Sequence, residues 1–224
     1  MSRSEPTDPR RLKLASDRHR PLYHFATPSN WLNDPNGAIY WKGDYHLFYQ
    51  HNPNGTFPAN TRWAHAISKD LVHWTDLPIA LTPTPGGPER ACFSGGTVNN
   101  NGVPTIIYHG VGLGTCIATA EDDGLIRWRK SPHNPVIPAP KSCEEWKTHD
   151  PCVWKDGDSW YVIQGSHVGS PREIGSSRDA AFMFRSPDLI NWEYMRPLYE
   201  PGDESDCAVP DFFQLGDKHM LLFA

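Results

Sequence analysis

The chain repeats a short pattern every 55 to 59 residues, and this period constrains its fold more than any other feature. Each copy holds an apolar run, a turn built around a glycine, and a second run that alternates apolar residues with others. The turn glycines are Gly43, Gly102, Gly157 and Gly216. Turns such as Lys-Gly-Asp and Asp-Gly-Asp between β-rich runs are typical of β-hairpins. We therefore expect each period to hold one hairpin together with further strands.

A second pattern recurs between the hairpins with the same phase. It places an acidic turn, a leucine and a tryptophan at matching offsets in residues 68–74, 122–128 and 186–192. Two independent marks in one phase predict a four-stranded β-propeller blade per period. Because a blade buries its faces only against its neighbours, such repeats require a closed ring or a stacked array. The apolar run that ends at Ala224 has no exit turn, so we expect a fragment that stops inside the fourth blade.

Composition agrees with an all-β fold and narrows the partners. Of the 224 residues 12% are aromatic, and the chain holds 18 Gly and 22 Pro, which favours many short strands. The formal net charge of −5 offers no basic footprint for nucleic acid and suits a neutral substrate. Neither a membrane span nor a signal peptide is visible, so we expect no membrane partner and a cytoplasmic protein. Residues 1–20 lie outside the repeat and are predicted to be a polar tail, with the propeller domain over 21–224.

Acidic residues precede three of the hairpin copies in the same phase. Asp34 precedes the first, Asp150 the third, and an acidic segment containing Glu204 and Asp206 the fourth. In a propeller the inner strands of all blades face one channel, so these carboxyl groups should converge. Glycoside cleavage needs two carboxyl groups that flank the scissile bond. The pattern therefore predicts a glycosidase site that requires neither a metal ion nor a cofactor.

The segment WLNDPNG at 31–37 resembles the WMNDPNG signature of glycoside hydrolase family 32, which includes invertases, inulinases, levanases and sucrose-phosphate hydrolases. Further matches follow in the order of the family, namely FYQ at 48–50, WAH at 63–65, FSGG at 93–96 and HDP at 149–151. The resemblance implies a five-bladed propeller of the invertase type followed by a β-sandwich. The last blade and the whole sandwich would then be absent from these 224 residues.

The resemblance also implies roles for individual residues. Asp34 would be the nucleophile that forms a covalent fructosyl intermediate, and Asp150 the carboxylate that stabilises the transition state. The residues expected to bind substrate are Asn33, Gln50, Phe57, Trp63, Phe93, Ser94 and His149. The implied activity is retaining hydrolysis of β-fructofuranosyl bonds in sucrose or fructans. A fructosyltransferase and a catalytically degenerate carbohydrate-binding propeller stay open as alternatives, and the oligomeric state is left open.

Two departures from the family pattern bear on the chemistry. His149 stands where the family has arginine, which replaces a five-donor fork by a ring with at most two donors. The family also places its acid/base glutamate directly before the cysteine that corresponds to Cys207, whereas Asp206 precedes Cys207 here. Aspartate is one methylene shorter than glutamate, but a two-residue insertion after Cys207 could compensate. We favour Asp206 as the acid, with Glu204 in reserve and the absence of a working acid as the third possibility.

Overall fold

The structure, a computed structural model, describes residues 9–139, 149–168, 178–200 and 207–224, and its secondary structure there is almost entirely β. Blade 1 contains β1 (Trp31–Trp41), β2 (Asp44–Asn52), β3 (Arg62–Ser68) and β4 (Trp74–Leu81). Blade 2 contains β5 (Cys92–Asn100), β6 (Val103–Gly110), β7 (Gly114–Ala120) and β8 (Trp128–Lys130), and β9 (Ile137–Pro138) also pairs with β7. Blade 3 contains β10 (Cys152–Asp156), β11 (Ser159–Val168), β12 (Arg178–Ser186) and β13 (Glu193–Tyr199). A further hairpin contains β14 (Asp211–Leu215) and β15 (Lys218–Leu222).

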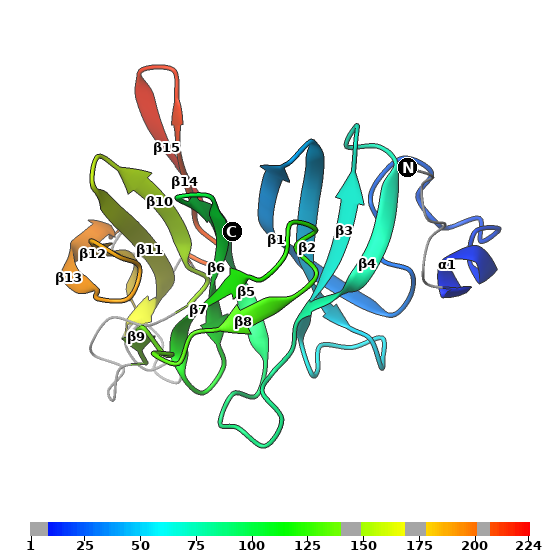
Figure 1. Cartoon of the computed structure of the whole chain (residues 1–224), viewed down its shortest axis with the longest axis horizontal. Helices are drawn as coiled ribbons and strands as arrows, with labels where there is room; N and C mark the ends of the chain where they lie inside the picture. Colours follow the sequence, from blue (N-terminus) through cyan, green and yellow to red (C-terminus); the bar gives the residue numbers. More distant parts are fainter. Residues whose placement is uncertain (1–8, 140–148, 169–177, 201–206) are drawn as a thin grey trace.

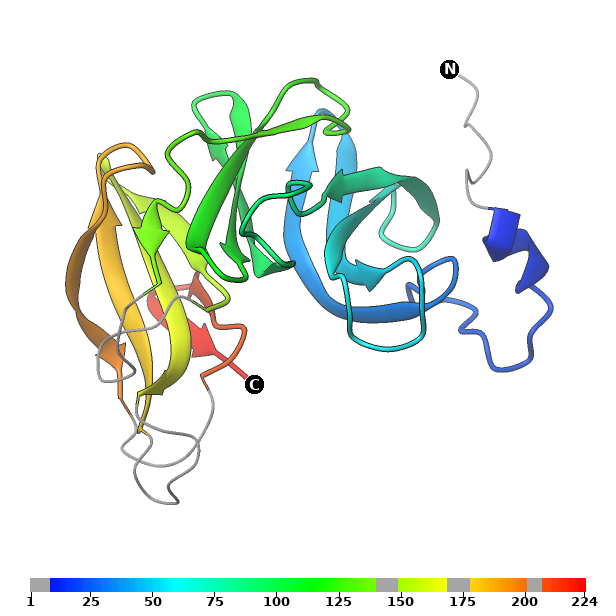
Figure 2. The same cartoon turned by 90° about the horizontal axis from the view of Figure 1, so that it is seen from below.

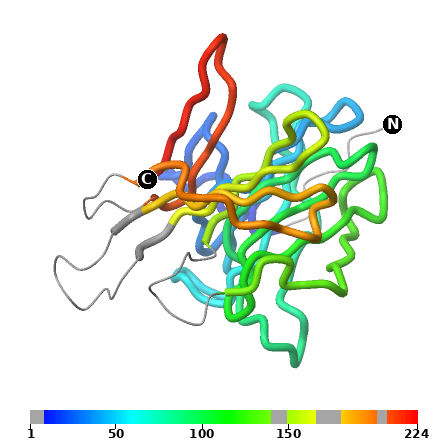
Figure 3. The backbone as a smooth tube through the Cα atoms, turned by 90° about the vertical axis from the view of Figure 1, so that its left-hand side faces the viewer, coloured from blue at the N-terminus to red at the C-terminus, as the bar shows by residue number. Residues whose placement is uncertain are grey.

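Each of the three blades is an antiparallel meander. The blades lie side by side, as seen from below in Figure 2. In Figure 1 blade 2 lies between blade 1 and blade 3, and the β14–β15 hairpin projects beyond them, as the red tube also does in Figure 3. The innermost strands contact one another in succession, β1 with β5, β5 with β10, and β10 with β14. This arrangement confirms the propeller architecture expected from the repeat.

The four predicted hairpins are the first two strands of each sheet, β1/β2, β5/β6, β10/β11 and β14/β15. Their turn glycines have φ of 91°, 89°, 56° and 63° in chain order. A positive φ is strained for residues with a Cβ, which is why glycine recurs at this point of every period.

The Leu and Trp of the second pattern close the turn between the third and fourth strands of each blade. In blade 3 the Ser186 hydroxyl accepts a hydrogen bond from the backbone N–H of Leu189 at 2.9 Å, and the Trp192 indole donates to the Leu189 carbonyl at 2.9 Å. Trp74 and Trp128 donate to the carbonyls of Leu71 and Leu125 in the same way, at 3.2 and 2.8 Å. The tryptophan therefore locks its own turn in addition to packing on the blade.

The blades are held together by apolar clusters between their faces. Neighbouring residues of β6 point to opposite faces, so Ile106 packs with Phe48 and Trp63 of blade 1, while Ile107 packs with Val162 of blade 3. Blade 2 therefore buries both of its faces, which is the behaviour expected of an inner repeat.

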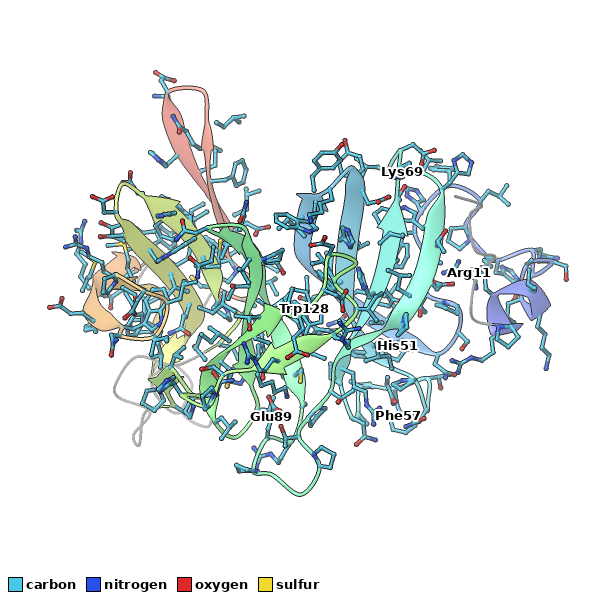
Figure 4. The ribbon with its side chains drawn as sticks, in the orientation of Figure 1. Arg11, His51, Phe57, Lys69, Glu89 and Trp128 are labelled. Carbon is cyan, nitrogen blue, oxygen red and sulfur yellow. The ribbon has the colours of Figure 1, made fainter. Side chains whose placement is uncertain are left out.

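Residues 9–20 lie outside the sheets, yet they are anchored to blade 1. Helix α1 (Pro9–Lys13) carries Arg11, whose guanidinium donates two hydrogen bonds to the Asp76 carboxylate of β4, at 2.5 and 2.6 Å. Arg11 also donates to the carbonyl of Ala26 at 2.8 Å. Figure 4 shows Arg11 between α1 and β4. Within the described ranges no helix has the length and apolar character needed to cross a membrane.

Candidate active site

A pocket of about 420 Å³ opens where the innermost strands meet. It is lined by residues 34–38 of β1, 94–97 of β5, 150–153 at the start of β10, and 209–211 at the start of β14. All four sheets therefore contribute to one site. Each sheet contributes residues from the same position of its repeat. Residues that are far apart in the sequence therefore lie close together in the pocket.

Asp34 sits at the end of a hydrogen-bonded chain of polar side chains. Ser94 Oγ donates to Asp34 Oδ2 at 2.6 Å, and Gln50 Nε2 donates to Ser94 Oγ at 2.6 Å. Asn33 Nδ2 in turn donates to Gln50 Oε1 at 3.3 Å. Ser94 and Gln50 are 2% and 5% exposed, so the chain is shielded from water. A hydroxyl that donates to a carboxylate makes a short, charge-assisted bond, which fixes the direction of the Asp34 oxygen.

Irregular pairing in the inner strands aims these side chains. The β1/β2 register shifts between Leu32 and Pro35, around Asp34, and the β5/β6 register shifts between Cys92 and Gly95, around Ser94. Such bulges rotate side chains out of strict alternation and are frequent beside active sites. Two bulges, one in each strand, thus allow Asp34 and Ser94 to meet.

Asp150 is held by a different set of contacts on the neighbouring wall. It is 5% exposed, lines the pocket, and has a φ of 44°, in the left-handed region. Its Oδ2 lies 2.9 Å from His149 Nδ1 and accepts a hydrogen bond from the backbone N–H of Val209 at 3.3 Å. Strained backbone of this kind persists where the surroundings fix it, which is common at functional sites. The structure therefore brings Asp34 and Asp150 to one cavity.

Two residues predicted to line the pocket lie elsewhere. Phe57 is 61% exposed in the loop after β2, at the lower end of blade 1 in Figure 4, and is not part of the pocket wall. Trp63 is fully buried between blades 1 and 2, where its indole donates to the Phe93 carbonyl at 2.8 Å. A Cβ on Gly37 would come within 3.1 Å of the Trp63 ring, so Trp63 backs the pocket wall instead of facing substrate.

The remaining predicted residues fall into two groups. Asn33, Gln50, Phe93 and His149 are not among the residues that line the pocket, but each contacts another predicted residue. Glu204 and Asp206, the candidate acids, lie outside the described residues. The segment that follows them does enter the site, since Val209, Pro210 and Asp211 line the pocket.

Three lining residues with a carboxylate, amide or hydroxyl side chain were not predicted as site residues. Asp211 adds a third carboxylate, and its signal was the Pro-Asp-Phe sequence before the fourth hairpin. Asn36 and Thr97 also line the pocket, and the Asn36 amide and the Thr97 hydroxyl are buried without a hydrogen-bond partner in the described part of the chain. Buried polar groups normally have partners, so these atoms are exceptions in the wall of the pocket. Asn36 could have been found within the WLNDPNG segment.

Three β-blades and a further hairpin bring carboxylates from their innermost strands around one small cavity, which is the arrangement expected of a propeller glycosidase. The family model described as "Glycosyl hydrolases family 32 N-terminal domain" matches residues 24–224, so the chain belongs to this family.

Relatives agree with this assignment in sequence and in structure. The chain is 34% identical over 232 residues to the sucrose-6-phosphate hydrolase of Zymomonas mobilis, covering 95% of this chain and 44% of that protein. It is 35% identical over 217 residues to the cell wall β-fructofuranosidase of Pisum sativum, covering 91% and 38%. The fructan 1-exohydrolase IIa of Cichorium intybus, solved with 1-kestose, superposes with a TM-score of 0.75 at 32% identity, covering 87% of this chain and 37% of that one. The chain thus spans less than half the length of these relatives.

Proposed function

We propose that the protein is a retaining glycosidase that cleaves β-fructofuranosyl bonds in sucrose or a short fructan. The observation that carries this proposal is the convergence of Asp34 and Asp150 on one pocket, with Asp34 fixed by the Ser94 hydroxyl. Relatives named for hydrolysis of sucrose 6-phosphate and of fructofuranosides support the substrate class. The substrate would be a neutral or phosphorylated small fructoside.

In this mechanism Asp34 attacks the anomeric carbon of the fructosyl group while an acid protonates the leaving oxygen. The acid then acts as a base, takes a proton from water, and the resulting hydroxide displaces Asp34 to release fructose. Asp150 accepts hydrogen bonds from the fructosyl hydroxyls as positive charge develops on the ring.

We assign the acid to Asp206, with Glu204 as the alternative, because both lie a few residues before the segment 209–211 that lines the pocket. A variant that lacks the acid should lose most activity on sucrose but still release a good leaving group rapidly in the first turnover, because that step then needs no protonation. The Asp206→Ala and Glu204→Ala variants should therefore differ in this assay. The acid is the residue whose variant behaves in this way.

The direct test is fructose release from sucrose and 1-kestose by the protein with whatever its reading frame encodes beyond residue 224. Asp34→Asn should reduce kcat/KM by about a thousandfold or more, because the nucleophile is lost. Asp123→Asn is the matched control, since the Asp123 carboxylate is 75% exposed on the surface. Full activity of the Asp34→Asn variant would contradict the proposal.

A non-catalytic carbohydrate-binding propeller is the second candidate, favoured by His149 in place of arginine and by the altered segment before Cys207. Calorimetric binding of sucrose without fructose release by the parent protein would select it. Transfer of fructose to a second sugar, detected as a longer oligosaccharide, would instead indicate a fructosyltransferase.

A further inference from the structure

Three aromatic rings pack together next to Asp150, outside the residues assigned above to the chemistry. The His149 ring lies 5.4 Å from the His109 ring at 44°, and 6.4 Å from the Phe93 ring at 86°, measured between centroids. The rings of Phe93 and His109 are themselves 6.0 Å apart. The imidazole of His149 thus touches two other rings while its Nδ1 faces Asp150 Oδ2 at 2.9 Å.

His109 belongs to β6 and is partly buried. Its Nδ1 is shielded from solvent and has no partner in the portion of the chain that the structure describes. The pKa of His109 is lowered to about 4, mainly by burial and to a smaller extent by the neighbouring His149, while Asp150 opposes the shift. Phe93 on β5 and Thr115, which is opposite His109 on β7, do not titrate in this range. His109 is therefore neutral near pH 7 and places no positive charge beside His149.

The His149 imidazole needs a neighbouring group to fix its orientation toward Asp150. An arginine would meet a carboxylate with a planar fork that carries its own charge at every physiological pH. An imidazole has two distinct nitrogens, and only the ring orientation that presents an Nδ1–H holds Asp150. The side chain of His149 is 38% exposed, so its orientation depends on the groups that pack against its covered side.

We propose that His109 is a positioning residue for Asp150, which acts by holding the His149 imidazole so that its Nδ1 stays against the carboxylate. The proposal deepens the function given above and rests on it, because Asp150 matters for catalysis only if the protein cleaves a fructoside. The contact itself is a property of the fold and can be tested without activity.

The kinetic test is a double-mutant cycle in which His109→Ala and His149→Ala are made singly and together. If His109 acts through His149, His109→Ala lowers kcat about tenfold in the parent and has little further effect in the His149→Ala background. His109→Phe restores most of the rate, because it supplies a neutral ring of similar shape. Additive losses in the cycle would overturn the proposal, since they would indicate a general structural role.

The test that does not depend on activity is an NMR titration of the His149 imidazole. In the parent, Asp150→Asn should lower the pKa of His149 by on the order of one pH unit, because the adjacent anion is removed. In the His109→Ala background the same substitution should shift this pKa by less than half as much, since the ring is no longer held at the carboxylate. An equal shift in both backgrounds would refute the positioning role.

The NMR titration tests the role of His109 independently of whether the protein cleaves a fructoside. A parent protein that releases no fructose would defeat the proposed function, while the titration would still decide whether His109 orients His149. If His109→Ala does not fold, His109→Thr removes the ring while keeping a branched side chain on the strand, and the same comparison applies.

Discussion

The turns that end in Trp74, Trp128 and Trp192 offer a stability experiment with an internal control. Leu71, Leu125 and Leu189 occupy the same turn position, with φ of 64°, 55° and 67°. Their burial differs, because Leu71 is 55% exposed whereas Leu125 and Leu189 are 0% and 1% exposed. Replacing each leucine by glycine should therefore change the backbone contribution to the free energy of unfolding equally in the three turns. The contribution from side-chain packing should change by different amounts.

The magnitudes follow from these two terms. Glycine relieves about 1–2 kcal/mol of left-handed strain and costs about 0.5–1 kcal/mol of extra backbone entropy. Leu71→Gly should thus leave the free energy of unfolding unchanged or raise it by up to about 1.5 kcal/mol. Leu189→Gly also loses a buried side chain worth about 2–5 kcal/mol, so it should lower the free energy of unfolding by about 0.5–5 kcal/mol.

Urea unfolding followed by tryptophan fluorescence measures both values in the same protein. Leu71→Ala is the control that removes the exposed side chain but keeps the strain, and it should be close to neutral. Equal destabilisation by Leu71→Gly and Leu189→Gly would show that burial does not separate these turns, and the reasoning would be wrong.

Three further predictions concern the polar contacts. Ser94→Ala should lower kcat/KM about tenfold to a hundredfold, because a charge-assisted bond worth about 1.5–3 kcal/mol no longer directs Asp34; unchanged fructose release would show that Asp34 is held by other groups. Arg11→Ala should lower the free energy of unfolding by about 3 kcal/mol, since it removes two hydrogen bonds from a guanidinium to the Asp76 carboxylate, which is 3% exposed; an unshifted urea midpoint would contradict a structural role for residues 9–20. Burial and the neighbouring His46 hold the pKa of His65 well below 6.5, so the unfolded chain binds a proton that the folded one does not, and stability should fall as the pH drops below about 6.5. At pH 5.5 this loss is about 1.4 kcal/mol, and a His65→Gln variant whose stability shows the same slope between pH 7 and pH 5.5 would argue against it.

The sequence by itself determined the elements that depend on neighbouring residues. The turn glycines, the Leu and Trp of the second pattern, and the proline after Asp34 and after Asp150 act within a few positions of the chain. Their periodic recurrence was enough to predict blades and to place Asp34 and Asp150 on one axis. Ser94 and Gln50 were found through their resemblance to a family pattern, and the structure places both next to Asp34.

Only the tertiary structure decided which of these side chains face the pocket. Trp63 was expected there but is buried behind Gly37, and Phe57 lies out on a loop, whereas Asp211 and Thr97 do line the cavity. The contact of Arg11 with Asp76 and that of His109 with His149 join different segments that no local pattern links. The physical reason is that bulges break the alternation of the inner strands, and that the packing of one blade on the next selects the partners. Both the bulges and the packing between blades depend on the assembled sheets. The sequence therefore identifies candidate residues for the chemistry, whereas the tertiary structure determines which residues they contact.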